Sequence, residues 1–332
     1  MNWEELDWEA LGRLRRRFIG EEGFDGPYWT SAAELAGYDA TYGERIGWKW
    51  DQVLRELHRR GWTPPSGPLL DWGCGSGVAS RRVLRAFGAG NFTGLTVWDH
   101  SPLAADFAAA AAAREFPGLP VSQATPGLLA SGEPIGLLVV SHVLNELAPA
   151  ALESLHALAA RASAVLWVES GSAAVSRALG TVRERLRADF RVVAPCTHEG
   201  PCPVLAPGRE RDWCHFFAPP PAAIFADSGW VKFGQRAGID LRSLPYSFLA
   251  LDRRPPAEDR AGLSRVIGRV EHFKPYARWL NCDADGMVEL ELPKRADPRL
   301  LKELERTREP LVYRWRREGP RVMGGEAQVP PA

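Results

Sequence analysis

The chain has 332 residues, of which 45% are hydrophobic and 25% are charged, as in an ordinary globular protein. The 41 arginines and lysines balance the 41 aspartates and glutamates, which argues against a protein that coats nucleic acid indiscriminately. An apolar run of about 18 residues, the length of a membrane span, does not occur. The acidic N-terminus is unlike a secretory signal or a transit peptide, so a cytoplasmic location is expected.

The first part of the chain is predicted to be helical and the next to alternate between strands and helices. Residues 3–60 carry apolar side chains at helical spacing. After the break at Pro64-Pro65 we expect strands at 69–72, 92–98, 135–140, 164–168 and 190–193. Helices are expected between them at 78–87, 103–116, 149–160 and 173–188. Buried-type strands that alternate with helices of this length predict an α/β fold with a doubly wound parallel sheet.

The last part of the chain is predicted to form a small β-rich module. A further strand is expected at 246–251, then strands at 265–271 and 277–281, a hairpin into 287–292, a helix at 298–306 and a strand at 311–315. The predicted domains are an N-terminal helical segment (1–63), an α/β domain with a cysteine-rich insertion at 195–225 (64–258), the β-rich module (259–323) and a disordered tail (324–332).

A glycine-rich loop joins the first strand of the α/β domain to the helix that follows. It reads Asp71-Trp72-Gly73-Cys74-Gly75-Ser76-Gly77, and its glycines let a ligand approach the backbone at the helix N-terminus. The dinucleotide motif G-x-G-x-x-G would need glycine at position 78, which is valine. The loop instead resembles the first motif of class I S-adenosylmethionine-dependent methyltransferases. This resemblance implies cofactor binding by Asp71, Gly73, Gly75 and Gly77, with Asp99 at the end of the next strand on the ribose.

The segment after the predicted strand 135–140 lies where such enzymes hold the acceptor of the methyl group. It reads Ser141-His142-Val143-Leu144-Asn145-Glu146-Leu147, which makes His142, Asn145 and Glu146 the candidates for catalysis. The Asn/Asp-Pro-Pro-aromatic pattern of methyltransferases that act on exocyclic amines is missing. The alternative is that these residues cap and pack the following helix.

Four cysteines stand outside any periodic apolar run. Cys196 and Cys202 are flanked by prolines, Cys214 lies in Asp212-Trp213-Cys214-His215-Phe216, and Cys282 lies in the predicted module. Their context suits thiolates gathered around a soft metal or an iron–sulfur cluster. The separations of 5, 11 and 67 residues do not fit the common zinc-finger frames.

The spacing of the cysteines alone allows two other interpretations. Pro195-Cys196 matches the Pro-Cys step of 5-methylcytosine RNA methyltransferases, but that nucleophile follows the fourth strand and Cys196 follows the predicted strand 190–193. Alternatively, the cysteines are unrelated core residues.

Several motifs together resemble the methyltransferase-like assembly factors of the small ribosomal subunit, a family with mitochondrial members and bacterial relatives. They are Leu70–Gly77, His142–Leu147, Val193–Pro203, Asp212–Phe216 and Tyr246–Leu249. The resemblance implies a 4Fe–4S cluster held by Cys196, Cys202, Cys214 and Cys282, the last matched through its place in a strand before an Asp/Gly turn. It also implies binding to RNA and proteins of the small subunit, without a membrane and as a monomer off the ribosome.

The resulting prediction is a class I methyltransferase fold that binds S-adenosylmethionine and an iron–sulfur cluster and acts on the small ribosomal subunit. One alternative is an active RNA methyltransferase whose cluster is purely structural. A second is a zinc-stapled binding module without catalysis. For RNA contact, Arg314, Arg316 and Arg317 of the β-rich module are the candidates.

Overall fold

The structure is a computed structural model that describes residues 3–19, 28–255, 260–307 and 311–328. Its chain divides into two compact units. The first comprises Met1–Leu54, Pro64–Leu166 and Pro219–Leu244, and the second comprises Arg55–Thr63, Trp167–Ala218 and Pro245–Ala332. This division differs from the domain boundaries expected from the sequence, because residues 167–218 group with the C-terminal strands.

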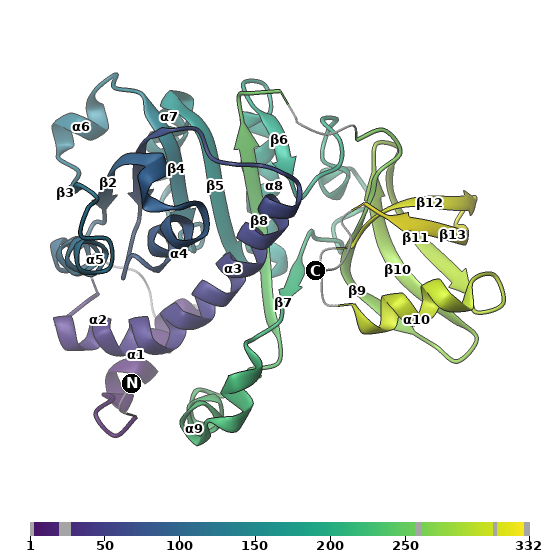
Figure 1. Cartoon of the computed structure of the whole chain (residues 1–332), viewed down its shortest axis with the longest axis horizontal. Coiled ribbons are helices and arrows are strands. Elements are labelled where there is room, and N and C mark those ends of the chain that lie inside the picture. Colours follow the sequence, from purple (N-terminus) through teal and green to yellow (C-terminus); the bar gives the residue numbers. More distant parts are fainter. Residues whose placement is uncertain (1–2, 20–27, 256–259, 308–310, 329–332) are drawn as a thin grey trace. The chain divides into compact units, whose positions relative to one another are not determined.

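The N-terminal helices and the alternating part of the chain form as the sequence predicts (Figure 1). Their bounds are α1 (Trp8–Phe18), α2 (Ala32–Tyr38), a π-helix η1 (Asp39–Gly43), α3 (Glu44–Arg59), β1 (Gly67–Trp72), α4 (Val78–Phe87), η2 (Ala89–Asn91), β2 (Phe92–Trp98), α5 (Pro102–Glu115), β3 (Val121–Gln123), α6 (Pro126–Ala130), β4 (Ile135–Ser141), α7 (Pro149–Arg161), β5 (Ala162–Ser170), α8 (Ala173–Leu186) and β6 (Arg191–Ala194).

The remaining elements complete the sheet and the C-terminal module. They are η3 (Pro203–Leu205), β7 (Phe216–Ala218), η4 (Ala222–Ala226), α9 (Ser228–Ala237), β8 (Leu244–Asp252), β9 (Ser264–His272), β10 (Tyr276–Asp283), β11 (Gly286–Pro293), α10 (Pro298–Arg306), β12 (Val312–Glu318) and β13 (Arg321–Ala327). Among the described residues, no helix is long and apolar enough to cross a membrane.

The large sheet has the strand order β3-β2-β1-β4-β5-β8-β6, with β7 paired to β8. Strand β1 pairs in parallel with β2 and with β4, whereas β6 and β8 are antiparallel. The order reverses between β1 and β4, so the carboxyl ends of these strands mark the expected ligand-binding edge. The predicted α/β fold with a Rossmann-like parallel core is confirmed.

The C-terminal module is a closed barrel with the order β10-β11-β13-β12-β9. Its core contains Trp279, Leu290, Tyr313 and Val322, and α10 adds two leucines to it. The expected disordered tail is wrong for residues 324–327, because they belong to β13 and pair antiparallel with β12. Pro330 and Pro331 lie outside the described residues.

Candidate functional site

The glycine loop lies between β1 and α4 in the first unit. Gly77 is the N-cap of α4 in the left-handed conformation, with φ 75°. Gly75 also has a positive φ of 51°, and among the described residues nothing lies within 4 Å of the position that a Cβ would take there. The backbone at Gly75 is therefore open to a ligand, as the sequence motif requires.

Asp99 follows β2 and contacts this loop directly. One carboxylate oxygen accepts a hydrogen bond from the Gly75 backbone N at 2.9 Å, and the other accepts from the Ser101 backbone N at 2.9 Å. Burial raises the pKa of Asp99, and these two backbone hydrogen bonds act in the opposite direction. The structure thus places Asp99 beside the loop, where it supports the conformation of Gly75.

Asp71 lies at the end of β1, beneath the loop, and is fully buried. The Ser80 hydroxyl donates to its Oδ2 at 2.6 Å, whereas Oδ1 has no hydrogen-bond partner among the described residues. Burial raises the pKa of Asp71 to about 6. A buried acceptor without a partner is costly, so its presence here fits a site that a ligand donor completes.

His142 follows β4 at the same edge of the sheet and has a positive φ of 55°, which is uncommon for a residue other than glycine. Its Nε2 lies 3.1 Å from Lys49 Nζ, and its Nδ1 lies 3.2 Å from Ser141 Oγ. The Trp50 indole donates to the same hydroxyl at 2.9 Å. Burial, followed by the charges of Lys49 and Arg45, lowers the pKa of His142 well below its usual value. The imidazole is therefore neutral near pH 7.

The other two candidates in this segment differ in their surroundings. The Tyr28 hydroxyl donates to Glu146 Oε2 at 3.4 Å, whereas Asn145 is exposed. Helix α7 starts at Pro149, and its N-cap residue Ala148 offers no side-chain hydrogen bond. Neither His142 nor Glu146 therefore occupies the N-cap position of the following helix.

Sequence reasoning missed the N-terminal contribution to this site. Lys49 and Trp50 come from α3, and Tyr28 precedes α2. One signal was available: Lys49 is one of only five lysines among 41 basic residues. A lysine that interrupts such a strong arginine bias in an amphipathic helix is worth testing as a functional residue.

The four predicted cysteines all belong to the second unit and lie within electrostatic range of one another. Burial raises the pKa of the Cys214 thiol well above its usual value, and the charges of Cys196, Cys282 and Cys202 raise it further. Burial likewise raises the pKa of Cys282, with further contributions from Cys196 and Cys202. The four sulfur atoms are thus near enough for their charges to interact, despite the 67 residues between Cys214 and Cys282.

Helix α8 holds the cysteine-bearing loop in place. The Arg183 Nε donates to Cys196 Sγ at 3.2 Å, and Glu184 Oε1 accepts from the Cys202 backbone N at 2.9 Å. Two turns earlier on the same helix, the Arg177 guanidinium donates to three carbonyl oxygens of the loop, those of Val204, Arg209 and Asp212, at 2.8, 2.9 and 2.9 Å. These helix residues lie outside the cysteine motifs, so the sequence alone does not mark them.

A histidine also approaches one of the thiols. His198 Nε2 lies 3.8 Å from Cys282 Sγ. Across the described ranges, no three His, Cys, Asp or Glu side chains are arranged so that they could hold a metal ion.

A sequence model of the family described as "Mitochondrial small ribosomal subunit Rsm22" matches residues 60–292 of this chain. No curated protein matches. Among solved structures, magnesium protoporphyrin IX methyltransferase from Synechocystis is similar with 13% identity and a TM-score of 0.40 over 74% of this chain and 96% of that chain. TrmK from M. capricolum is similar with 9% identity and a TM-score of 0.34 over 61% of this chain and 70% of that chain.

Proposed function

This chain belongs to the Rsm22 family of the mitochondrial small ribosomal subunit, and from that premise we propose that it is an S-adenosylmethionine-binding, iron–sulfur-containing factor that acts on the small ribosomal subunit. The family match, over residues 60–292, carries the proposal, because it includes the glycine loop, Asp99 and all four clustered cysteines. Cofactor binding, the cluster and action on the small subunit are taken in turn.

Cofactor binding is supported by the surroundings of the glycine loop. The backbone at Gly75 is open, and the adjacent Asp99 carboxylate is a hydrogen-bond acceptor at the same loop. S-Adenosylmethionine carries an ammonium group and two ribose hydroxyls, so it presents donors to such acceptors. When bound, the cofactor supplies an electrophilic methyl group.

Replacing Asp99 with alanine is expected to weaken S-adenosylmethionine binding by about 1.5–3 kcal/mol, because a charged acceptor on the ribose is lost. The loop also loses the support that Asp99 gives to the Gly75 N–H. Asp99→Asn, which keeps one acceptor oxygen, should have an intermediate affinity. Isothermal titration calorimetry measures the three dissociation constants. Asp106→Ala, which removes an exposed carboxylate from α5, is the control. Equal affinities for wild type and Asp99→Ala would rule out the assignment.

A 4Fe–4S cluster is supported by the donor set around Cys196, Cys202, Cys214 and Cys282. Four thiols of one unit lie within electrostatic range of one another, and the Arg183 guanidinium already donates to one sulfur. A multi-iron cluster occupies more space than one ion, so its ligands need not converge as closely as those of a single zinc. In the family context the cluster would be held by these four residues and would tie the loop after β6 to β10.

Action on the small subunit is tested by sedimentation. The full-length protein is mixed with purified small-subunit particles, or with protein-free small-subunit RNA, and run on sucrose gradients. Co-migration with either is the expected result. A protein that stays at the top of both gradients across a range of salt concentrations would contradict the proposal.

Methyl transfer to RNA is a second candidate function, favoured by the neutral His142 beside Lys49 at the sheet edge. His142 would help to orient the methylated group and would not take up its proton, because burial and the charge of Lys49 disfavour the protonated imidazole. Transfer of a tritiated methyl group from S-adenosylmethionine to small-subunit RNA is the test. Wild-type incorporation that disappears in His142→Ala, with cofactor affinity unchanged, supports catalysis. Absence of incorporation in the wild type supports a binding factor.

A further inference from the structure

The C-terminal barrel has a recognisable strand order. Strands β9, β10 and β11 form an antiparallel meander, β11 pairs in parallel with β13, and β12 pairs antiparallel with both β13 and β9. Helix α10 lies between the third and fourth strands in sequence. A five-stranded Greek-key barrel of this kind is an OB-fold, whose ligands bind on its second and third strands, between the loops that join strands one and two and strands four and five.

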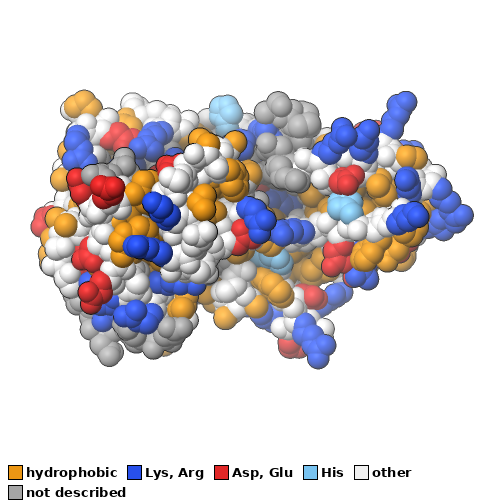
Figure 2. All heavy atoms as spheres, turned by 90° about the horizontal axis from the view of Figure 1, so that it is seen from below, with side chains coloured by type: hydrophobic (Ala, Val, Ile, Leu, Met, Phe, Trp, Pro, Cys, Tyr) orange, Lys and Arg blue, Asp and Glu red, His pale blue; other side chains and the backbone are white. Residues whose placement is uncertain are grey.

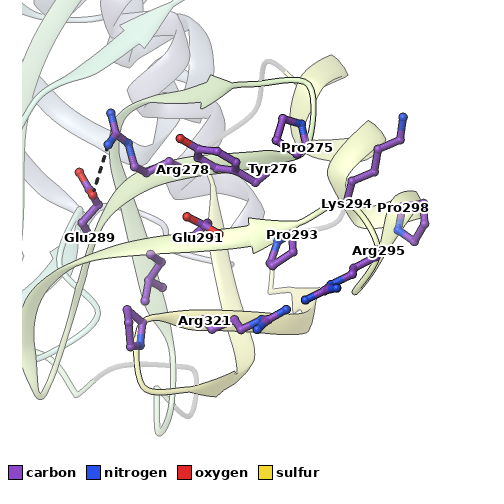
Figure 3. Close-up of a pocket in the computed structure, with 12 residues that line it drawn as sticks. Pro275, Tyr276, Arg278, Glu289, Glu291, Pro293, Lys294, Arg295, Pro298 and Arg321 are labelled. Atoms are coloured by element: carbon purple, nitrogen blue, oxygen red, sulfur yellow. Dashed lines mark ion pairs between the residues drawn. The ribbon is translucent and has the colours of Figure 1, made fainter.

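A groove of about 910 Å³ lies on that face of the barrel (Figure 3). Tyr276 of β10 and Glu289 of β11 line its floor, Pro275 comes from the loop between β9 and β10, and Pro320 comes from the turn between β12 and β13. Its volume is within the range of about 300–1,000 Å³ that is usual for ligand sites. The groove thus occupies the ligand-binding face that the strand order predicts.

Three exposed basic side chains at the groove, Lys294, Arg295 and Arg321, have no carboxylate partner among the described residues. Arg278 differs from them, because its guanidinium pairs with Glu271 at 2.7 Å and with Glu289 at 3.6 Å. Figure 3 shows Arg295 and Arg321 pointing toward one another. Two guanidinium groups that converge without an acid between them favour an anion such as a phosphate, which accepts hydrogen bonds from both.

An aromatic pair includes one residue of the groove, Tyr276, and its neighbour Phe273. The rings of Phe273 and Tyr276 are stacked, with centroids 4.7 Å apart and an interplanar angle of 26°. Phe273 is 41% exposed, which is unusual for so large an apolar side chain. The Arg278 guanidinium lies 5.5 Å from the centroid of the Phe273 ring. A surface aromatic pair in a groove that also carries unpaired cations is the combination with which proteins bind the bases and phosphates of a single strand.

We infer that this groove binds single-stranded RNA, with bases stacked at Phe273 and Tyr276 and phosphates held by Lys294, Arg295 and Arg321. The inference deepens the proposed function and rests on it for the identity of the nucleic acid. A duplex is disfavoured, because its bases are stacked inside the helix and cannot reach the rings. The groove carboxylates Glu289 and Glu291 repel phosphates and so favour a path along the basic rim.

The basic residues expected from the sequence lie elsewhere on the barrel. Arg314 donates to the Ala261 carbonyl at 3.1 Å, and Arg317 pairs with Asp283 at 3.4 Å. These two arginines are therefore used within the barrel itself. Arg316 is exposed but is not among the residues that line the groove. Figure 2 shows further Lys and Arg side chains scattered over the surface, so basic character alone does not single out the groove. What distinguishes the groove is that its unpaired cations occur together with an aromatic pair.

Fluorescence anisotropy of the full-length protein with a labelled single-stranded RNA of mixed sequence tests the inference. Lys294→Ala/Arg321→Ala is expected to weaken binding and to reduce the slope of log K against log salt by about 1.4, since each phosphate contact to a single strand contributes about 0.7. Lys302→Ala/Arg306→Ala removes the same charge from exposed positions of α10 and should change neither quantity appreciably. Tyr276→Ala is expected to lose about 5- to 150-fold in affinity, the equivalent of one stacked base, and Tyr276→Phe should restore most of it.

The results separate this inference from the proposed function. Equal affinities and salt slopes for the two double variants, or duplex RNA bound as tightly as the single strand, would overturn it. Single-strand binding that depends on Lys294 and Arg321 supports it, even if the protein fails to migrate with small subunits. That failure would count against the proposed function alone.

Discussion

Replacing Glu56 with alanine is expected to lower the free energy of unfolding by about 3–5 kcal/mol, because two buried guanidinium groups would lose their counter-charge. The Glu56 side chain is fully buried near the end of α3. One carboxylate oxygen accepts from Arg60 Nη2 at 2.7 Å, and the other accepts from Arg265 Nη2 at 3.1 Å. Arg265, on β9, is itself 2% exposed. Urea titration followed by tryptophan fluorescence measures the effect.

The control for this variant is Glu271→Ala, which breaks an exposed ion pair with Arg278. Such pairs contribute about 0–1 kcal/mol, so the control should be nearly as stable as wild type. A Glu56→Ala protein with the stability of Glu271→Ala would show that the buried triad is not needed.

The contribution of Glu56 should also depend on pH. Burial acts to raise the pKa of this carboxyl, but the charges of Arg265 and Arg60 outweigh burial and hold the pKa below its usual value. A depressed pKa means that the group stabilises the fold fully above the pKa of an unfolded glutamate, about 4.3, and less as pH falls further. The stability difference between wild type and Glu56→Gln should therefore narrow in acid below about pH 4. A difference that stays constant down to pH 2 would contradict this origin.

Loss of any one of Cys196, Cys202, Cys214 or Cys282 is expected to abolish iron binding. Protein purified without oxygen should be brown and contain iron and sulfide in equal amounts, as a cluster requires. The four cysteine-to-serine variants should be colourless, since the thiolates act as one set. Cys74→Ser is the matched control, because this fifth cysteine is buried in the glycine loop of the other unit and should leave iron content unchanged.

Metal analysis also decides between iron and zinc. One zinc per chain and no sulfide would reverse the assignment from iron to zinc. In that case His198 is the expected histidine ligand, because its Nε2 lies 3.8 Å from Cys282 Sγ. His198→Ala should then release the zinc. If the site instead holds a cluster on four thiolates, His198→Ala should keep its iron. Because metal binding is coupled to local folding, serine variants should be cleaved faster by proteases in the loop after β6.

Much of the fold could be predicted because its elements carry strong local signals. Helices α4 and α10 have the predicted bounds, and the uninterrupted apolar run of β4 identified a buried parallel strand. The elements that were missed lack such signals. Strands β3 and β7 have three residues each, and α9 contains two glycines. Strand β13 includes Gly325, where an added Cβ would collide with the Trp315 ring. The glycine is required by the side chain of the neighbouring strand β12, so it gives no local signal for a strand.

The candidate sites likewise contain parts that the sequence predicts and parts that only the fold reveals. The glycine loop and the cysteine motifs are continuous in sequence, so their chemistry could be predicted from neighbouring residues. The contacts of Lys49 with His142, of Arg177 with the cysteine loop, and of Glu56 with Arg265 join residues 93, 27 to 35 and 209 positions apart. Only the tertiary structure specifies such pairs. The unpaired cations of the barrel groove were hidden for the same reason, since pairing is a property of the folded surface.

The discontinuous make-up of the second unit sets an order of events during synthesis. Its three segments, Arg55–Thr63, Trp167–Ala218 and Pro245–Ala332, are separated by parts of the other unit. Glu56 therefore leaves the ribosome some 209 residues before Arg265. The first three cysteines likewise emerge well before Cys282. Because closing such long loops is slow, the second unit can mature only after Arg265 and Cys282 have been synthesised. A cluster on these four cysteines, as proposed above, could therefore form only after Cys282 has been synthesised, and a shortage of iron or sulfide would leave the four thiols without a ligand.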